Sequence, residues 1–165
     1  MKHTPKFVLF FVLISLLNSC APRGEDPGQM VTAAKELDQR FLEAYNNGDV
    51  DALMDTYWNS PELVSYPPDA LVLRGWQNVK VAAEETFKQM KGAKLELTEM
   101  NNKAVGGVVL GWGTWRIQMT MPGGEVMTLI GRYSDVKAKR DGKWVYIIDH
   151  ASVVLPPPPD SADMQ

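Results

Sequence analysis

The 165-residue chain contains one cysteine and two histidines, and its formal net charge is −3. A single cysteine excludes a disulfide framework and any cysteine-rich zinc site, and so few histidines argue against a histidine-clustered metal site. Because phosphate binding needs clustered basic residues, the acidic balance argues against a nucleic-acid partner. Internal repeats, a phosphate-binding glycine loop, a dinucleotide-binding glycine pattern and a serine nucleophile elbow are also missing. The sequence therefore predicts neither a metal nor a cofactor.

The N-terminus has the pattern of a bacterial lipoprotein signal. Two lysines precede an apolar run over 7–17, which is too short to span a bilayer as a helix. The run leads into Leu-Asn-Ser-Cys at 17–20, which resembles a lipobox, the motif whose cysteine is acylated and becomes the mature N-terminus. We therefore predict a signal peptide over 1–19, lipidation of Cys20, a tether over 20–28 and membrane contact through the lipid alone.

The residue after Cys20 is Ala21 and not aspartate. In the lipoproteins that this signal resembles, that choice favours the outer membrane, so we predict a cell-envelope protein facing the periplasm. The alternative is an ordinary secretory signal in which Cys20 is incidental. At the other end, four consecutive prolines begin at Pro156, and they predict a Pro-rich, disordered tail over 155–165.

The first half of the intervening chain has helical periodicity. Asp26-Pro27 is a helix-start signal, and Asn47-Gly48 is a stop signal for an amphipathic helix that ends near Asn46. Asp49 can cap a second helix, and a third is expected to open near Gly75. The elements predicted here are helices over about 27–46, 50–60 and 75–91, with brief strands over 62–66 and 70–73.

The second half has the pattern of an antiparallel β-meander. Glycine-containing turns separate four apolar segments, which predicts strands over about 93–104, 107–121, 125–138 and 143–154. The predicted class is α+β, with three N-terminal helices packed on a strongly curved, mainly antiparallel sheet. Several strands are apolar on both faces, although helices can cover only one. This favours a homodimer through the second face; the alternative is one curved sheet that buries both faces itself.

Four segments of the chain have a recognisable pattern in this order of elements. They are Phe-Leu-Glu-Ala-Tyr-Asn-Asn-Gly-Asp over 41–49, Gly-Arg-Tyr-Ser-Asp-Val over 131–136, Arg-Asp-Gly-Lys-Trp over 140–144 and Asp-His-Ala-Ser over 149–152. The first resembles the end of the first helix, and the others the paired terminal strands, of the SnoaL-like branch of the nuclear transport factor 2-like superfamily. The association domain of calcium/calmodulin-dependent kinase II ends in a similar arrangement. The resemblance implies a cone-shaped half-barrel over 29–154 with an internal pocket.

In the resembling proteins, an arginine and a His-x-Ser pair face this pocket, which carries over to Arg132, His150 and Ser152. A regular last strand places His150 and Ser152 on one face, and the hairpin at Asp141-Gly142 brings Arg132 beside them. The arginine fork suits an anionic or carbonyl ligand, and a histidine can move protons near neutral pH. The alternative is an internal polar network that only satisfies buried groups.

Aromatic residues supply the predicted pocket wall. Trp58, Tyr66 and Trp112 are the wall candidates, and Glu62 and Asp69 are acids expected near the mouth. The superfamily includes isomerases, cyclases, dehydratases and non-catalytic modules, and fold alone does not decide among them. The leading hypothesis is a lipid-anchored domain that binds a small organic molecule. The alternatives are an isomerase or dehydratase using His150 as acid and base, and a non-catalytic dimerisation scaffold.

Overall fold

A computed structural model describes residues 24–154 of the chain. The predicted signal peptide over 1–19, Cys20 and the predicted tail over 155–165 lie outside the described residues. The predicted tether over 20–28 is described only in part, and its last two residues already belong to the first helix. Within the described range, no helix is long and apolar enough to cross a membrane.

Local capping signals set both ends of the first helix, α1 (Pro27–Asn47). The side chain of Asp26 accepts a hydrogen bond from the Gln29 backbone N–H, and Pro27 occupies the first turn, where no N–H is needed. Gly48 follows the helix at φ 67°, a left-handed conformation that glycine adopts without strain. Both ends lie within a residue of the predicted positions.

The following elements are shorter than the sequence predicts. Asp49 caps the second helix as expected, because its carboxylate accepts a hydrogen bond from the Ala52 backbone N–H. The third helix begins directly after Gly75, again as predicted. These elements are α2 (Val50–Met54), β1 (Val64–Tyr66), β2 (Leu73–Arg74) and α3 (Trp76–Gln89).

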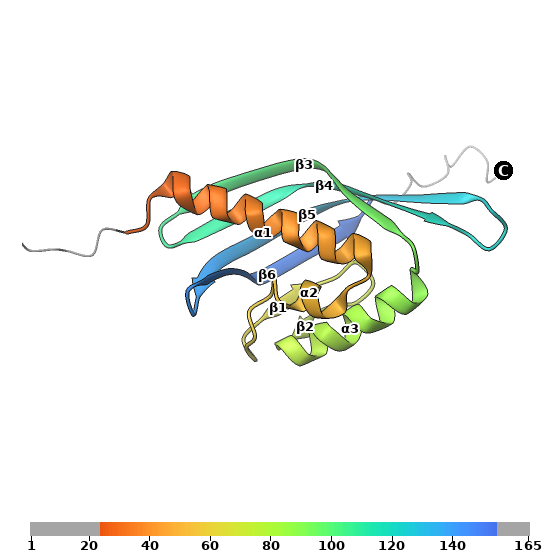
Figure 1. Ribbon diagram of the computed structural model, residues 1–165, viewed down its shortest axis with the longest axis horizontal. Helices are drawn as coiled ribbons and strands as arrows, with labels where there is room; N and C mark the ends of the chain where they lie inside the picture. The colour runs from red at the N-terminus through yellow and green to blue at the C-terminus, as the bar shows by residue number, and fades with distance from the viewer. Residues whose placement is uncertain (1–23, 155–165) are drawn as a thin grey trace, which may run out of the picture.

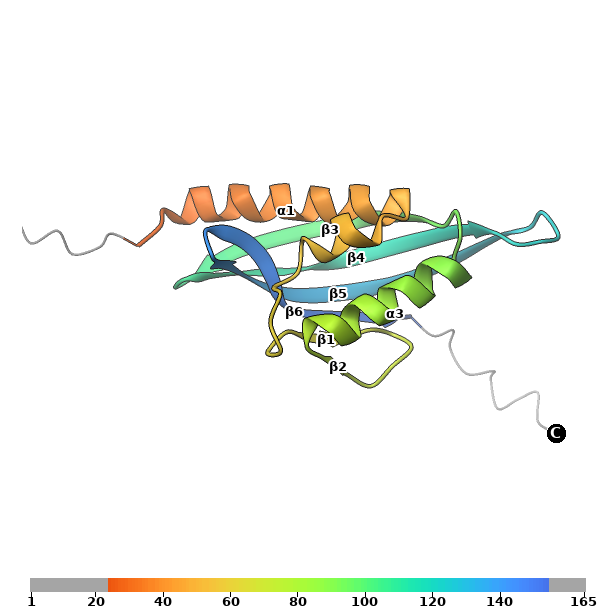
Figure 2. The same cartoon turned by 60° about the horizontal axis from the view of Figure 1, so that its bottom comes forward.

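Four long strands form the predicted meander. They are β3 (Lys94–Val105), β4 (Val108–Thr120), β5 (Val126–Arg140) and β6 (Lys143–Val153). The six-stranded sheet has the order β2-β1-β6-β5-β4-β3; among these six strands β1 and β6 are parallel and the other neighbouring pairs are antiparallel. Figures 1 and 2 show α1 lying along one face of the sheet, while the β4–β5 hairpin projects beyond the helices. The predicted α+β class is confirmed.

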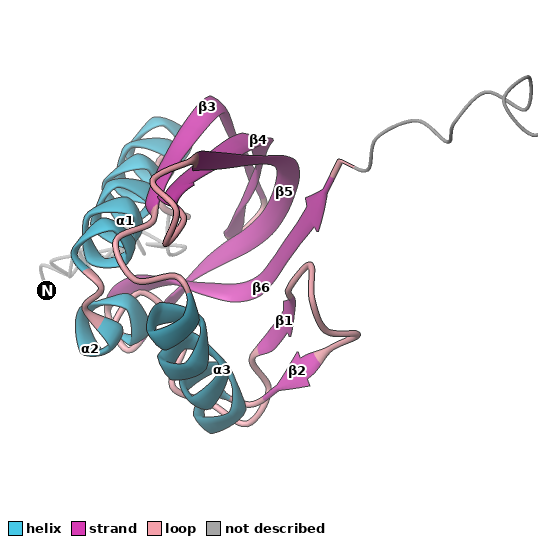
Figure 3. Ribbon diagram, turned by 90° about the vertical axis from the view of Figure 1, so that its right-hand side faces the viewer, coloured by secondary structure: helices cyan, strands magenta, loops and turns pink. Residues whose placement is uncertain are grey.

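The sheet curls around the helices and leaves one face convex. In Figure 3 the strands sweep from β3 through β5 and β6 to β1, and the helices lie within the curve. The main hydrophobic core packs α1, α2 and α3 against this concave face. Its most deeply buried members, none more than 2% exposed, are Met30, Ala34, Leu37, Met54, Leu63 and Val109. Helices on the concave side therefore bury one face of the sheet and leave the other to solvent.

One register change in β6 decides which of its side chains face the concave side. Tyr146 and Ile148 pair with neighbouring residues of β5, so Ile147 is an extra residue in β6. Such a β-bulge shifts the alternation of side chains by one position. Asp149 consequently lies on the concave side with Tyr146, and Ile148 points outward.

Candidate functional site

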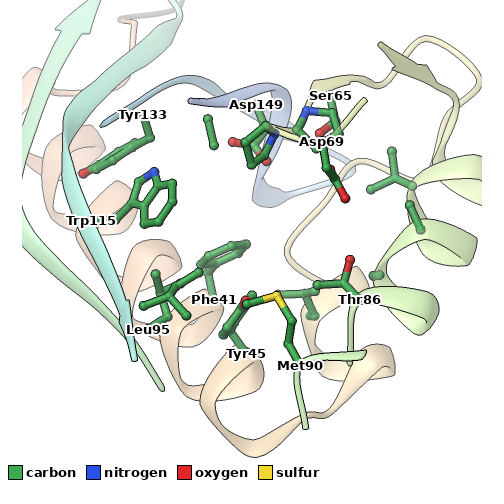
Figure 4. Close-up of a pocket in the computed structure, with 18 of the residues that line it drawn as sticks. Phe41, Tyr45, Ser65, Asp69, Thr86, Met90, Leu95, Trp115, Tyr133 and Asp149 are labelled. Carbon is green, nitrogen blue, oxygen red and sulfur yellow. The ribbon is translucent and has the colours of Figure 1, made fainter. Parts of the chain in front are cut away.

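The concave face, α1, α3 and the β1–β2 loop enclose a cavity of about 530 Å³. That volume lies within the range of small-molecule sites. Figure 4 shows Phe41, Tyr45, Leu95 and Met90 along one side of the open space, with Asp149 on another. Aliphatic and aromatic side chains make up most of the wall. The aromatic lining residues are Phe41, Tyr45, Tyr57, Phe87, Trp115, Tyr133 and Tyr146.

A row of small and polar residues crosses the concave face at one level. Asp149 of β6 pairs with Ser65 of β1 on one side and with Asp135 of β5 on the other. Asp135 in turn pairs with Gly111 of β4, and Gly111 pairs with Asn102 of β3. Directly opposed residues on one face have Cβ atoms roughly 5 Å apart, so the carboxylates of Asp135 and Asp149 are close neighbours.

One fully buried lysine neutralises part of this row. The Lys137 ammonium lies 2.9 Å from a carboxylate oxygen of Asp38 in α1 and 2.8 Å from one of Asp135. It also donates to the Asn102 amide oxygen at 2.9 Å, and the Tyr146 hydroxyl donates to Asp38 at 2.6 Å. These contacts tie α1 to the sheet beneath it. The ion pairs and hydrogen bonds also offset the free-energy cost of burying the charges of Lys137, Asp38 and Asp135.

The two opposed carboxylates hold their protons more tightly than usual. Burial raises the pKa of Asp135 to about 7, and Lys137 opposes that rise without cancelling it. Burial also raises the pKa of Asp149, although the Tyr57 hydroxyl donates to its carboxylate at 2.8 Å. Burial, followed by the charge of Asp149, raises the pKa of Tyr57, so its hydroxyl remains a donor. The site can therefore exchange protons near neutral pH.

Two glycines in the strands make room for large side chains on the concave face. A Cβ at Gly111 would lie 2.5 Å from both the Asp135 carboxylate and the Lys137 ammonium. A Cβ at Gly131 would overlap the indole of Trp115, which packs over that position and lines the cavity. Glycine inside these strands therefore marks a close approach of side chains and not a turn.

The expectation that Arg132, His150 and Ser152 face the cavity is wrong. None of them lines it, and all three lie on the convex face, where Arg132 pairs with Ser152 and the His150 Nδ1 lies 3.3 Å from the Ser134 hydroxyl. For His150 and Ser152 the expectation assumed a regular last strand, and the bulge at Ile147 reverses the faces of the residues that follow it. Arg132 lies on β5, where it alternates with the cavity-lining Tyr133 and therefore points to the other face. The prediction of an anionic ligand depended on an inward-facing Arg132, so the cavity lacks the arginine that was expected to bind the anion.

The predicted aromatic wall is also misplaced. Trp112 and Tyr66 point outward from the convex face with 43% and 39% of their surfaces exposed, and Tyr66 contacts His150 edge to face. Trp58 stacks with the Arg140 guanidinium outside the cavity. Trp115, which has the opposite parity to Trp112, is the tryptophan that lines the wall. Of the two acids expected near the mouth, Asp69 lines the cavity and Glu62 does not. No cluster of acidic, cysteine or histidine side chains suited to a metal ion occurs among residues 24–154.

The comparisons with known proteins identify the family and support the fold. The sequence over 35–156 matches the family described as the SnoaL-like domain. The chain belongs to this family. No curated protein matches the SnoaL-like chain.

Solved structures share the fold of this SnoaL-like domain at low sequence identity. A candidate dehydratase of the nuclear transport factor 2-like family from Streptomyces avermitilis has a TM-score of 0.72 and 19% identity, covering 79% of this chain and 100% of that one. A nuclear transport factor 2-like superfamily protein from Salmonella enterica has a TM-score of 0.68 and 20% identity, covering 81% and 97%. A candidate calcium/calmodulin-dependent protein kinase II association domain from Xanthomonas campestris has a TM-score of 0.64 and 22% identity, covering 73% and 85%.

The sequence held signals for residues that the pattern analysis missed. Asp38 interrupts the buried stripe of α1, where a carboxylate needs a partner across the interface. The glycines at 111 and 113 alternate within β4, a spacing typical of backbone over which larger neighbours pack. Read together, these features point to a polar cluster on the concave face of the SnoaL-like domain. Nothing local indicated the bulge at Ile147, which brings Asp149 into that cluster.

Proposed function

We propose that this SnoaL-like domain binds a small organic molecule in its internal cavity. The observation that carries the proposal is the composition of the wall, which is mostly aromatic and aliphatic and includes a few polar groups, among them the opposed Asp135 and Asp149. Sites for small molecules are usually built this way, because apolar walls supply affinity and a few polar groups fix orientation. The family supports the same interpretation, since SnoaL-like domains often hold small ligands.

Native mass spectrometry of protein purified gently from its own host tests the proposal. We expect a reproducible adduct whose mass defines the ligand. Ala82 of α3 lines the cavity, whereas the adjacent Val81 is 49% exposed on the same helix. Ala82→Phe should fill the space and remove the adduct, and Val81→Phe should retain it. An adduct that survives Ala82→Phe, or its absence even after exposure to host extract, would contradict the proposal.

A second candidate is an isomerase or dehydratase whose acid and base are the carboxylates of the cavity. The raised pKa of Asp135, about 7, favours it, because such a group both gives and takes protons near neutral pH. The similar Streptomyces structure is itself described as a candidate dehydratase. Asp149→Asn should then abolish turnover of the molecule identified above, while His150→Gln on the convex face should leave it. The reverse result would restore the histidine mechanism.

We also propose that the domain is held in the cell envelope by acylation of Cys20, at the outer membrane and facing the periplasm. The support is the sequence pattern over 1–20 and the alanine that follows it. Intact mass analysis of the protein from host membranes should show an N-terminal acylated cysteine. Cys20→Ser should lack that mass and leave the membrane fraction. Unchanged membrane attachment of Cys20→Ser would contradict the anchor.

The convex face of the sheet supports a further part of the proposal, a homodimer. Large apolar side chains point outward from four neighbouring strands, and each is at least 36% exposed in the single chain. They are Tyr66, Leu110, Trp112, Ile130 and Ile148. Leu110 and Ile148 both pair with Val136 of β5, whereas Ile130 lies further along that strand opposite Arg116. Exposed apolar patches commonly mark interfaces, and a second copy presents a matching surface.

A further inference from the structure

The charge of the cavity wall is one-sided. Five carboxylate residues line the cavity, and its lining within residues 24–154 includes no lysine, arginine or histidine. The acidic lining residues are Asp38, Asp69, Glu85, Asp135 and Asp149. Asp69 and Glu85 are exposed, whereas Asp38 and Asp135 are buried. Glu85 is paired with Lys88 at 2.7 Å, so the lining acids without an ion pair among residues 24–154 are Asp69 and Asp149.

The inner carboxylates outnumber the positive charge available to them. Lys137 lies between Asp38 and Asp135 and is fully buried, so its single charge is already shared by two acids. Asp149 receives a hydrogen bond from Tyr57 but has no ion-pair partner among the described residues. Because Asp135 and Asp149 are directly opposed across β5 and β6, their charges repel each other. A positive charge placed between them would relieve that repulsion.

We propose that the ligand of the cavity is an organic cation, a protonated amine joined to an apolar body. The inference rests on the proposed small-molecule function and names its ligand class. The ammonium pairs with Asp149 and Asp135, and the apolar body occupies the space bordered by Phe41, Tyr45 and Trp115 (Figure 4). Aromatic faces attract cations as well as hydrocarbon, so the same wall accepts both parts of the ligand.

Other ligand charges fit this cavity less well. An anion would lose its hydration without gaining a cationic partner, and it would add a negative charge beside opposed carboxylates. A neutral alcohol can accept or donate a hydrogen bond, yet it leaves the repulsion between Asp135 and Asp149 in place. An alcohol and an ammonium can both donate to the ionised carboxylates, but only the ammonium adds a positive charge, and this attraction in a partly buried site gives the amine its advantage.

Three probes with one hydrocarbon body and different end groups test the inference: phenylbutylamine, phenylbutanol and phenylbutyrate. Calorimetric titration of the full chain should show the amine binding about tenfold more tightly than the alcohol, with the carboxylate weakest. Alcohol or carboxylate binding as tightly as the amine overturns the cation inference and leaves the cavity function standing. Failure of all three to bind overturns both.

Substitution and pH identify the groups responsible. Asp149→Asn should weaken amine binding about tenfold and phenylbutanol binding by a smaller factor, and the remaining phenylbutanol binding also shows that the variant is folded. Asp141→Asn, in the exposed β5–β6 turn, is the matched control and should change neither affinity. An amine affinity unaffected by Asp149→Asn overturns the assignment of the ammonium to this site.

The pH dependence separates a cation from a carbonyl ligand. Asp135 faces Lys137 on its own strand, Asp38 from α1 and Asp149 from β6. Its carboxyl has a pKa of about 7, so its ionised fraction rises about tenfold between about pH 6 and about pH 8. Amine affinity should rise over that interval, up to about tenfold. A fall in amine affinity would mean that protonated Asp135 acts as a hydrogen-bond donor, and it would overturn the proposal.

Discussion

Asp135 couples the stability of the domain to pH. Its carboxyl has a pKa of about 7 in the folded protein, against about 3.9 in an unfolded chain. Between these values the folded state retains a proton that the unfolded state has released, so proton binding favours folding. We expect the free energy of unfolding to fall as pH rises from about 4 to about 7, by at most about 1.4 kcal/mol per pH unit, and then to level off.

Urea denaturation at a series of pH values measures this dependence. Asp149 contributes in the same direction, because burial raises its pKa as well. Asp135→Asn should therefore flatten the profile without abolishing it, and Asp141→Asn in the exposed turn should leave the profile as it is in the wild type. A wild-type protein that becomes more stable between about pH 4 and about pH 7 would contradict the burial of Asp135 as a protonatable group.

The bulge in β6 makes a prediction at the level of the strand. Tyr146 and Ile148 already pair with consecutive residues of β5, so deleting Ile147 turns β6 into a regular strand without moving Asp149 to the other face. We expect the deletion variant to fold, with a loss of about 1–2 kcal/mol from the partly buried isoleucine side chain. Thermal unfolding followed by circular dichroism measures the loss.

The control is a deletion in a strand without such a residue. The pairing of β4 with β5 runs unbroken from Val108 to Thr120, so deletion of Thr114 must reverse the faces of one half of β4. We expect that variant to remain unfolded. If both deletions are equally damaging, then Ile147 is not a removable bulge residue.

The strand β6 separates what the sequence could predict from what it could not. Both ends of α1 and the start of α2 were predictable because their causes are local: Asp26 and Asp49 cap, and Gly48 stops. The four long strands were predictable because turns punctuate an apolar run. The face of Asp149 was not, because the bulge is set by how β6 meets its neighbours, and one residue of shift exchanges the inward and outward sets. The prediction of the fold did not depend on which face Asp149 occupies, whereas the prediction of the site did.

At the scale of the whole molecule, the two faces of the sheet differ in composition. The concave face holds the acidic cavity, and the residues once expected there, Arg132, His150 and Ser152, lie on the convex face beside exposed apolar side chains. A dimer through the convex face would bury those residues without blocking the cavity, because the strands themselves lie between the two surfaces. The sequence predicted a second apolar face, and the open convex surface of the single chain is that face.

Substitution of Trp112 tests whether the convex face of the sheet joins two copies of the chain. Trp112 lies on β4, the strand next to the edge strand β3, with 43% of its surface exposed and with Leu110 two residues away on the same face. Trp112→Glu would place a charge in the middle of a buried interface, and we expect it to shift a dimer to monomer in sedimentation velocity while the cavity still binds its ligand. Leu71→Glu is the control, since Leu71 is 94% exposed on the β1–β2 loop and should not affect assembly. A wild-type monomer at all accessible concentrations, or a dimer that persists in Trp112→Glu, would mean that the convex apolar surface serves something other than a second copy of the chain.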